Sequence, residues 1–132
     1  MEKNPENIPL YFEKAGILQE NHDYKGAEKL YNEILTYFPS NYKALKEKAR
    51  LMLIQEKWQG AINLYERLLS WYNPEEEFYN NTAIAYIKSG NYQEALNYFN
   101  KTLELNPSNA DALFNRSKLE EMLYIDWYFF KF

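Results

Sequence analysis

An internal repeat with a fixed period constrains the fold of this chain more than any other feature of its sequence. Three short segments align with one another, at residues 23–27, 57–61 and 91–95, and each ends in an alanine. The three alanines stand 34 residues apart both times. A constant period in the range of about 20 to 50 residues is typical of solenoids, in which each unit packs only against its neighbours. We therefore expect a stack of similar units.

Each repeat carries apolar residues at the spacing of two helices. In the second half of each unit, apolar pairs recur at intervals of three and four residues, which is the spacing of one helix face. The first half has its own stripe, in which an aromatic residue or a leucine is followed four residues later by an alanine. These pairs are Tyr11 and Ala15, Leu45 and Ala49, and Tyr79 and Ala83. Because an alanine lets two helices cross closely, the pattern predicts two antiparallel helices per repeat.

Prolines and one glycine mark the ends of the predicted helices. Pro39 and Pro107 follow the second helix of the first and third repeats, and Pro74 follows that of the second repeat one position later. A proline just beyond a helix is an expected stop signal. The turns inside the pairs fall at residues 20–23, 55–57 and 89–91, and only the last contains a glycine, which most easily adopts a left-handed helix cap.

The aromatic residues, 18% of the chain, are predicted to be structural. Those at repeat positions that face between helices are Tyr24, Tyr31, Tyr37, Trp58, Tyr65, Trp71, Tyr92 and Phe99. We expect them to be buried in the core and not to serve as stacking surfaces for a ligand.

The repeats resemble the tetratricopeptide repeat family. The matching positions are Tyr11, Leu45, Tyr79 and Leu113; Ala15, Ala49, Ala83 and Ser117; Ala27, Ala61 and Ala95; and Pro39 and Pro107. The departures are Lys14, Lys48, Thr82 and Arg116, where the family usually has leucine, and Ile34 and Leu68, where it usually has alanine. The predicted organisation is a lead-in at residues 1–7, repeats at 8–41, 42–75 and 76–109, and a capping helix with an aromatic tail at 110–132.

The resemblance implies an all-α fold, an α-solenoid of three helix-turn-helix repeats wound into a right-handed superhelix. It also implies an adaptor or scaffold that binds a peptide or protein partner in a concave groove lined by the first helices. The predicted groove residues are Phe12, Lys43, Lys46, Arg50, Asn80, Asn81, Ile84, Lys88, Phe114 and Lys118.

The basic residues of the second repeat have two interpretations. Lys43, Lys46 and Arg50 lie on one helix face and could grip a carboxylate, with Arg50 able to do so through two hydrogen bonds. Alternatively, they are ordinary solvated charges balanced by Glu47 and Glu56. The sequence leaves both interpretations open.

Some members of the family bind chaperones by gripping a terminal carboxylate with five residues. Counted from the first repeat, none of the five positions carries the required residue type. Counted from the second repeat, the positions hold Lys46, Arg50, Asn81, Phe114 and Lys118, of which only Lys46 and Asn81 match. A carboxylate clamp is therefore a less favoured alternative to a general peptide groove.

The composition and motifs argue against several other classes of protein. A net charge of −4 disfavours a general nucleic-acid binder, which needs a clustered positive surface. The chain has no cysteine, its only histidine is His22 in a predicted turn, and its four glycines form no phosphate-binding motif. We therefore expect neither an enzyme nor a bound metal or cofactor.

The acidic run at residues 75–77 is better explained by interaction with a helix dipole than by a cation site.

The two ends of the chain lead to further expectations. The start lacks the pattern of a signal peptide and no apolar run is long enough to cross a bilayer, so a cytoplasmic location is expected.

Residues 123–132 are far more apolar than a solenoid cap. The alternatives are packing on the chain's own groove, burial in a second copy as a homodimer, attachment to a membrane interface, or a truncated or non-native end. The predicted self-association residues are Trp127, Tyr128, Phe129 and Phe130.

Overall fold

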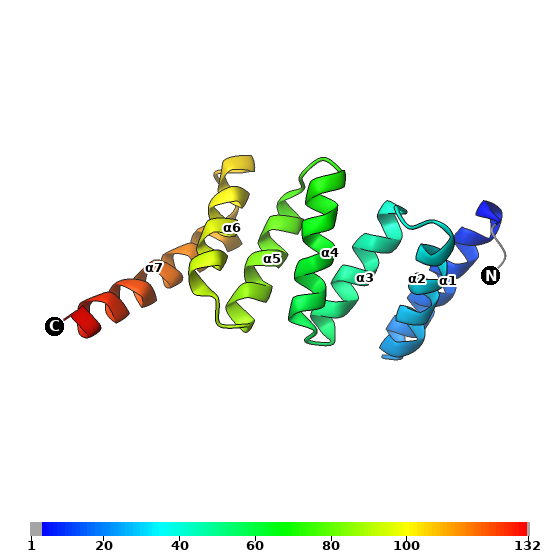
Figure 1. Cartoon of the computed structure of the whole chain (residues 1–132), viewed down its shortest axis with the longest axis horizontal. Coiled ribbons are helices and arrows are strands. Elements are labelled where there is room, and N and C mark those ends of the chain that lie inside the picture. The colour runs from blue at the N-terminus through cyan, green and yellow to red at the C-terminus, as the bar shows by residue number, and fades with distance from the viewer. Residues whose placement is uncertain (1–3, 132) are drawn as a thin grey trace. The chain divides into compact units, whose positions relative to one another are not determined.

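The computed structural model describes residues 4–131, and that part of the chain is all helical (Figure 1). A short 3-10 helix, η1 (Pro5–Asn7), precedes the first α-helix. The α-helices are α1 (Ile8–Glu20), α2 (Tyr24–Tyr37), α3 (Tyr42–Ile54), α4 (Trp58–Trp71), α5 (Glu76–Lys88), α6 (Tyr92–Leu105) and α7 (Ala110–Lys131). The prediction of an all-α fold built from helix pairs is confirmed. The start of the predicted lead-in, residues 1–3, and Phe132 at the end of the predicted tail lie outside the described residues.

Asparagine and aspartate side chains fix the starts of three helices. The Oδ1 atom of Asp23 accepts a hydrogen bond from the backbone N–H of Gly26 at 2.9 Å, and this caps α2. Asn41 caps α3 in the same way, and Asn109 caps α7, each at 2.9 Å. Such a cap satisfies one of the backbone donors that have no partner within the helix. Asn41 and Asn109, two residues after Pro39 and Pro107, therefore set where the next helix begins.

The chain divides into two compact units, residues 1–64 and residues 65–132, and each has its own core. In the first unit, α1, α2 and α3 contribute the fully buried Ala15, Ala27 and Ala44. Tyr31, Ile34 and Leu51 complete this cluster. The buried alanines confirm that small residues stand where the helices approach closely.

In the second unit, α5, α6 and α7 form an equivalent core. Ala83, Ala95 and Ala112 are fully buried around the ring of Phe99. The second half of α4 also belongs to this unit, and the Tyr65 ring packs on that of Phe78 with centroids 5.8 Å apart.

The prediction of buried aromatic residues is confirmed for three of the eight positions, is met only in part at four, and is wrong for Trp71. Tyr31, Tyr65 and Phe99 are buried, and the other predicted residues except Trp71 are half-buried. Trp71 is 53% exposed. It is the last residue of α4, and the equivalent Leu105 at the end of α6 is exposed as well. The repeat period identifies the face of a helix, but the final position of the second helix receives only partial cover from its neighbours.

The three turns inside the helix pairs share one backbone conformation. His22, Glu56 and Gly90 have φ angles of 61°, 59° and 84°, so the turns without glycine also use a left-handed residue. The amide that follows each of them donates to a carbonyl five residues earlier, for example Asp23 N–H to Leu18 C=O at 2.8 Å. These are the bonds of a Schellman cap, which satisfies the last carbonyls of the helix.

The acidic run at residues 75–77 begins α5, as predicted, with Glu76 and Glu77 in the first turn of the helix. Glu76 has an additional role that the sequence did not indicate. Its Oε1 atom accepts hydrogen bonds from Asn106 Nδ2 at 2.8 Å and from Asn109 Nδ2 at 3.0 Å. These bonds, led by the one from Asn109, lower the pKa of Glu76. The start of α5 is therefore tied to the loop between α6 and α7.

The apolar tail is the second half of α7 and not a separate segment. Leu119 is the last buried residue of this helix, and from Tyr124 to Phe130 every side chain is exposed, reaching 87% at Phe130. Among the described residues of the second unit, the tail therefore does not pack on the groove helix α5. Apolar composition at the end of a helix indicates surface that needs a partner, but it does not indicate which partner.

Candidate peptide-binding surface

In the first unit, the structure brings together two predicted residues from different repeats. Phe12 on α1 is half-buried, and its ring packs on Tyr31 with centroids 6.0 Å apart. Lys43 at the start of α3 places its Nζ atom 4.6 Å from the centroid of the Phe12 ring. A cation at this distance over an aromatic face is held electrostatically by the ring. The pair presents a positive charge and an apolar surface side by side.

The other two predicted groove residues of α3, Lys46 and Arg50, are also held by local contacts. The Lys46 Nζ atom lies 5.5 Å from the centroid of the Tyr42 ring. Arg50 Nη1 donates to Glu47 Oε1 at 2.9 Å, one turn away on the same helix. This ion pair is one of those that the second interpretation predicts, and a ligand carboxylate at Arg50 would have to compete with it. An ion pair this exposed contributes only about 0.2 to 1 kcal/mol, so a ligand carboxylate can replace Glu47 at small cost.

Tyr31 lies beneath this surface and contributes a neutral hydroxyl. Burial, and secondly the negative charge of Glu47, raise the pKa of Tyr31 to about 12. Its hydroxyl donates a hydrogen bond to the Gln19 side chain on α1. Gln19, in the last turn of α1, is therefore oriented by the core below it.

In the second unit, the predicted asparagines on α5 differ in their hydrogen bonding. Asn81 Nδ2 donates to the hydroxyl oxygen of Tyr65 at 3.1 Å. The side-chain oxygen of Asn80 is buried, and within the described residues it has no hydrogen-bond partner. An unsatisfied buried carbonyl costs about 1 to 3 kcal/mol, which a donor from a ligand or a water molecule would recover. Asn80 is therefore the acceptor of this surface that still requires a partner.

The remaining predicted residues of the second unit are distributed over two helices. Ile84 on α5 is half-buried against the core, and Lys88 is exposed in the last turn of α5. Phe114 on α7 is exposed, and Lys118, four residues later, places its Nζ atom 4.6 Å from the ring centroid. The second unit thus repeats the combination of a lysine with an aromatic ring seen in the first.

One polar cluster was not predicted from the sequence. The hydroxyls of Tyr86 and Tyr98 both donate to Glu66 Oε1, at 3.0 Å and 3.3 Å. The Lys101 Nζ atom lies 4.8 Å from the centroid of the Tyr98 ring, beside a cavity of about 290 Å³. Burial, followed by the hydrogen bond to Glu66, raises the pKa of Tyr86 to about 12, and burial raises that of Tyr98 further.

The alignment of the repeats does not predict this cluster. Glu66 occupies the position held by Asn32 and Asn100 in the other repeats, so a carboxylate that accepts from two tyrosines is specific to this interface.

Metal sites and membrane-spanning helices are both absent from the described residues. No set of three or more histidine, aspartate or glutamate side chains is placed to hold a metal ion within residues 4–131. In the same part of the chain, no helix combines the length and the apolar character needed to cross a membrane.

Comparison with known families agrees with the repeat register. One family model of the tetratricopeptide repeat matches residues 18–80, and a second matches residues 76–109. The chain belongs to the tetratricopeptide repeat (TPR) family. A comparison with curated proteins finds no match.

Solved structures of TPR proteins are similar over most of the chain. A TPR protein from Parabacteroides merdae is 26% identical with a TM-score of 0.84, over 90% of this chain and 48% of that one. The MamA protein is 18% identical with a TM-score of 0.83, over 91% of this chain and 66% of that one. The first TPR domain of Spaghetti (RPAP3), bound to the HSP90 peptide SRMEEVD, is 18% identical with a TM-score of 0.81, over 92% of this chain and 96% of that one. These likenesses establish the α-solenoid fold.

Proposed function

We propose that this protein is an adaptor that binds an extended acidic peptide along the first helices of its repeats. The observation that carries the proposal is the arrangement on α1 and α3, where Lys43 lies over the ring of Phe12 and Lys46 and Arg50 follow on the same helix. Lysines stacked on aromatic rings offer a peptide both charge and apolar contact area.

The second unit supports the same kind of ligand. A turn of the Asn80 amide toward the surface would bring its buried oxygen within reach of a peptide N–H group and would remove the cost of leaving it unsatisfied. Lys118 over Phe114 offers a second lysine–aromatic pair for an acidic or apolar side chain. Each unit, taken by itself, therefore offers a lysine–aromatic pair to an acidic peptide.

The similar structures add support of a general kind. The RPAP3 domain was solved with a peptide that contains two glutamates and an aspartate, so the fold accommodates an acidic peptide. Whether the ligand of this chain must end in a free carboxylate is a separate question. Only two of the five clamp positions carry the expected residue, so we propose recognition of acidic side chains rather than of the chain terminus.

Selection of a displayed peptide library on the purified protein tests the proposal. Enriched peptides would be labelled, and their affinities measured by fluorescence anisotropy. The double variant with Lys46→Ala and Arg50→Ala should bind about five- to thirtyfold more weakly, because each lost ion pair is worth about 0.5 to 1 kcal/mol. The matched control combines Lys25→Ala with Arg67→Ala, which removes one lysine and one arginine from second helices.

Each result of this experiment has a definite meaning. Enrichment of acidic peptides, with weaker binding by the groove variant alone, supports the proposal. Equal loss in both double variants indicates only a general effect of net charge and would overturn it. Amidation of the peptide C-terminus distinguishes the two modes of recognition, because a carboxylate clamp would lose affinity on amidation and the proposed mode would not.

A further inference from the structure

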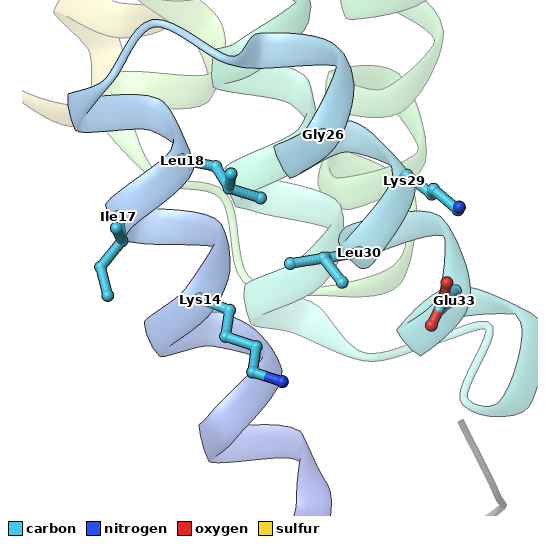
Figure 2. A pocket seen from close by; sticks show the side chains of 7 residues that line it. All are labelled: Lys14, Ile17, Leu18, Gly26, Lys29, Leu30 and Glu33. Carbon is cyan, nitrogen blue, oxygen red and sulfur yellow. The ribbon is translucent and has the colours of Figure 1, made fainter.

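The face of α1 and α2 that points away from α3 holds an apolar cavity of about 460 Å³ (Figure 2). Leu18 on α1 and Leu30 on α2 extend toward the space between the two helices, and Gly26 also lines the cavity. The side chains of Lys14, Lys29 and Glu33 stand around this apolar surface. The residues of this cavity are not part of the predicted peptide groove.

The repeat register shows that this face is covered in the other repeats. Leu10 and Ile17 of α1 are 48% and 52% exposed. The equivalent residues of α3 are Ala44 and Leu51, and those of α5 are Phe78 and Ala85. All four of these equivalents are fully buried. The first helix of the first repeat therefore has the same apolar face as α3 and α5, but on α1 this face is exposed to solvent.

In both successors the cover is a helix. Ala44 and Leu51 share a core cluster with Tyr31 and Ile34 of α2. Phe78 packs on the ring of Tyr65 from the second half of α4. The face of a first helix in this chain thus accepts a second helix that presents a tyrosine and, three and four residues later, two apolar residues.

The cavity also specifies which helix would fit. Where α5 and α6 have Tyr86 and Tyr98, which donate to Glu66, the first repeat has Leu18 and Leu30. Glu66 and its equivalent Asn32 are both exposed. An apolar residue at that position of an incoming helix can contact Leu18 and Leu30, whereas a carboxylate there would find no tyrosine donors.

The exposed end of α7 has this sequence. If Tyr124 takes the place of Tyr65, then Ile125 replaces Glu66, Trp127 replaces Leu68 and Tyr128 replaces Leu69. These α7 side chains are all exposed. Asn81, whose side chain donates to Tyr65, corresponds to Glu13 in α1, and a glutamate can accept a hydrogen bond from the Tyr124 hydroxyl.

We propose that the end of α7 from one copy of this chain docks in the α1–α2 face of a second copy. The contact joins two different surfaces, so it is heterologous, and each added copy presents a new free face. The chain would then extend its own solenoid from copy to copy. This assembly does not depend on peptide binding in the groove.

Analytical ultracentrifugation of the full chain, from about 1 to about 300 µM, tests the proposal with three single variants. Ile17→Glu places a charge on the acceptor face, and Ile125→Glu places one on the donor helix. Each should weaken association by about tenfold or more, because a carboxylate is then held against apolar side chains. Ile54→Glu is the matched control, since Ile54 is also 52% exposed and lies outside the cavity. Circular dichroism verifies that all variants keep their helical content.

A mixture of the two interface variants gives the decisive result. The Ile17→Glu chain keeps an intact donor and the Ile125→Glu chain an intact acceptor, so an equimolar mixture should form a dimer that cannot grow. A wild type that stays monomeric at all concentrations would overturn the proposal. So would association that survives Ile17→Glu, which indicates pairing of tails, or a mixture that remains monomeric.

Discussion

Replacing Glu56 by glycine should make the protein more stable. Glu56 is exposed and has a φ angle of 59°, a left-handed conformation that costs an L-residue with a side chain about 1 to 2 kcal/mol. Gly90 holds the equivalent position in the third repeat with a φ of 84° and carries no such cost. The two turns have the same hydrogen bonds, from Lys57 N–H to Met52 C=O and from Asn91 N–H to Tyr86 C=O, both at 2.8 Å. Glycine at position 56 therefore needs no rearrangement.

The expected gain is the relief of strain less the greater freedom of glycine in the unfolded chain. The second quantity is about 0.5 to 1 kcal/mol, which leaves a net stabilisation of about 0.5 to 1 kcal/mol. His22→Gly should gain less, because histidine tolerates the left-handed region better and its Nδ1 atom lies 2.8 Å from the Tyr24 hydroxyl. Gly90→Ala should lose about 1 kcal/mol.

Urea denaturation followed by circular dichroism measures these differences. The midpoint for Glu56→Gly should rise by about 0.3 M, given a typical dependence of about 2 kcal/mol per M. Glu56→Ala is the control, because it removes the same charge but keeps the backbone strain. If Glu56→Gly is no more stable than Glu56→Ala, the left-handed turn is not a source of strain and the reasoning fails.

Three further predictions concern the core and the titrating groups. Ala95→Leu should lower the free energy of unfolding by about 1 to 3 kcal/mol, because it overpacks a fully buried site, whereas the exposed Glu104→Gln should lower it by less than about 0.5 kcal/mol. Equal urea midpoints for the two variants would contradict the close packing at Ala95. The lowered pKa of Glu76 stabilises the fold above the usual glutamate pKa, and this contribution is lost as the pH falls through the pKa of the folded state. In Glu76→Gln, the free energy of unfolding should therefore decrease less steeply as the pH is lowered. The raised pKa values of Tyr86 and Tyr98 contribute stability that is present below pH about 10 and is lost as the pH rises toward 12. These two tyrosines should therefore ionise only when the protein unfolds in alkali, which the absorbance of tyrosinate would show.

The periodic features of the fold could be predicted from the sequence because they recur. The alanines at 27, 61 and 95 mark close helix crossings in every repeat, and all three are fully buried. Because the same packing requirement recurs in each repeat, the pattern remains recognisable even where one repeat carries a different residue. The left-handed turns were predictable only at Gly90, because His22 and Glu56 adopt that conformation under the hydrogen bonds of the cap and not by intrinsic preference.

The features that occur once could not be predicted in the same way. Glu66 replaces the asparagine of the other repeats, and only the packing of α4, α5 and α6 brings two tyrosine hydroxyls to it. The contact of Lys43 with Phe12 joins two repeats, so it depends on how α1 and α3 lie together and not on the spacing within either helix. The predicted groove positions identify helix faces, whereas the pairing of Arg50 with Glu47 depends on side-chain geometry.

The proposal that peptides bind along the first helices is tested most directly by nuclear magnetic resonance. Backbone amide shifts of the isotope-labelled protein would be followed during titration with an acidic peptide selected as described above. The account predicts that the largest changes fall on α1, α3 and α5, around Phe12, Lys46 and Asn80, with small changes on α2 and α4. Changes confined to the second helices or to the end of α7 would contradict it.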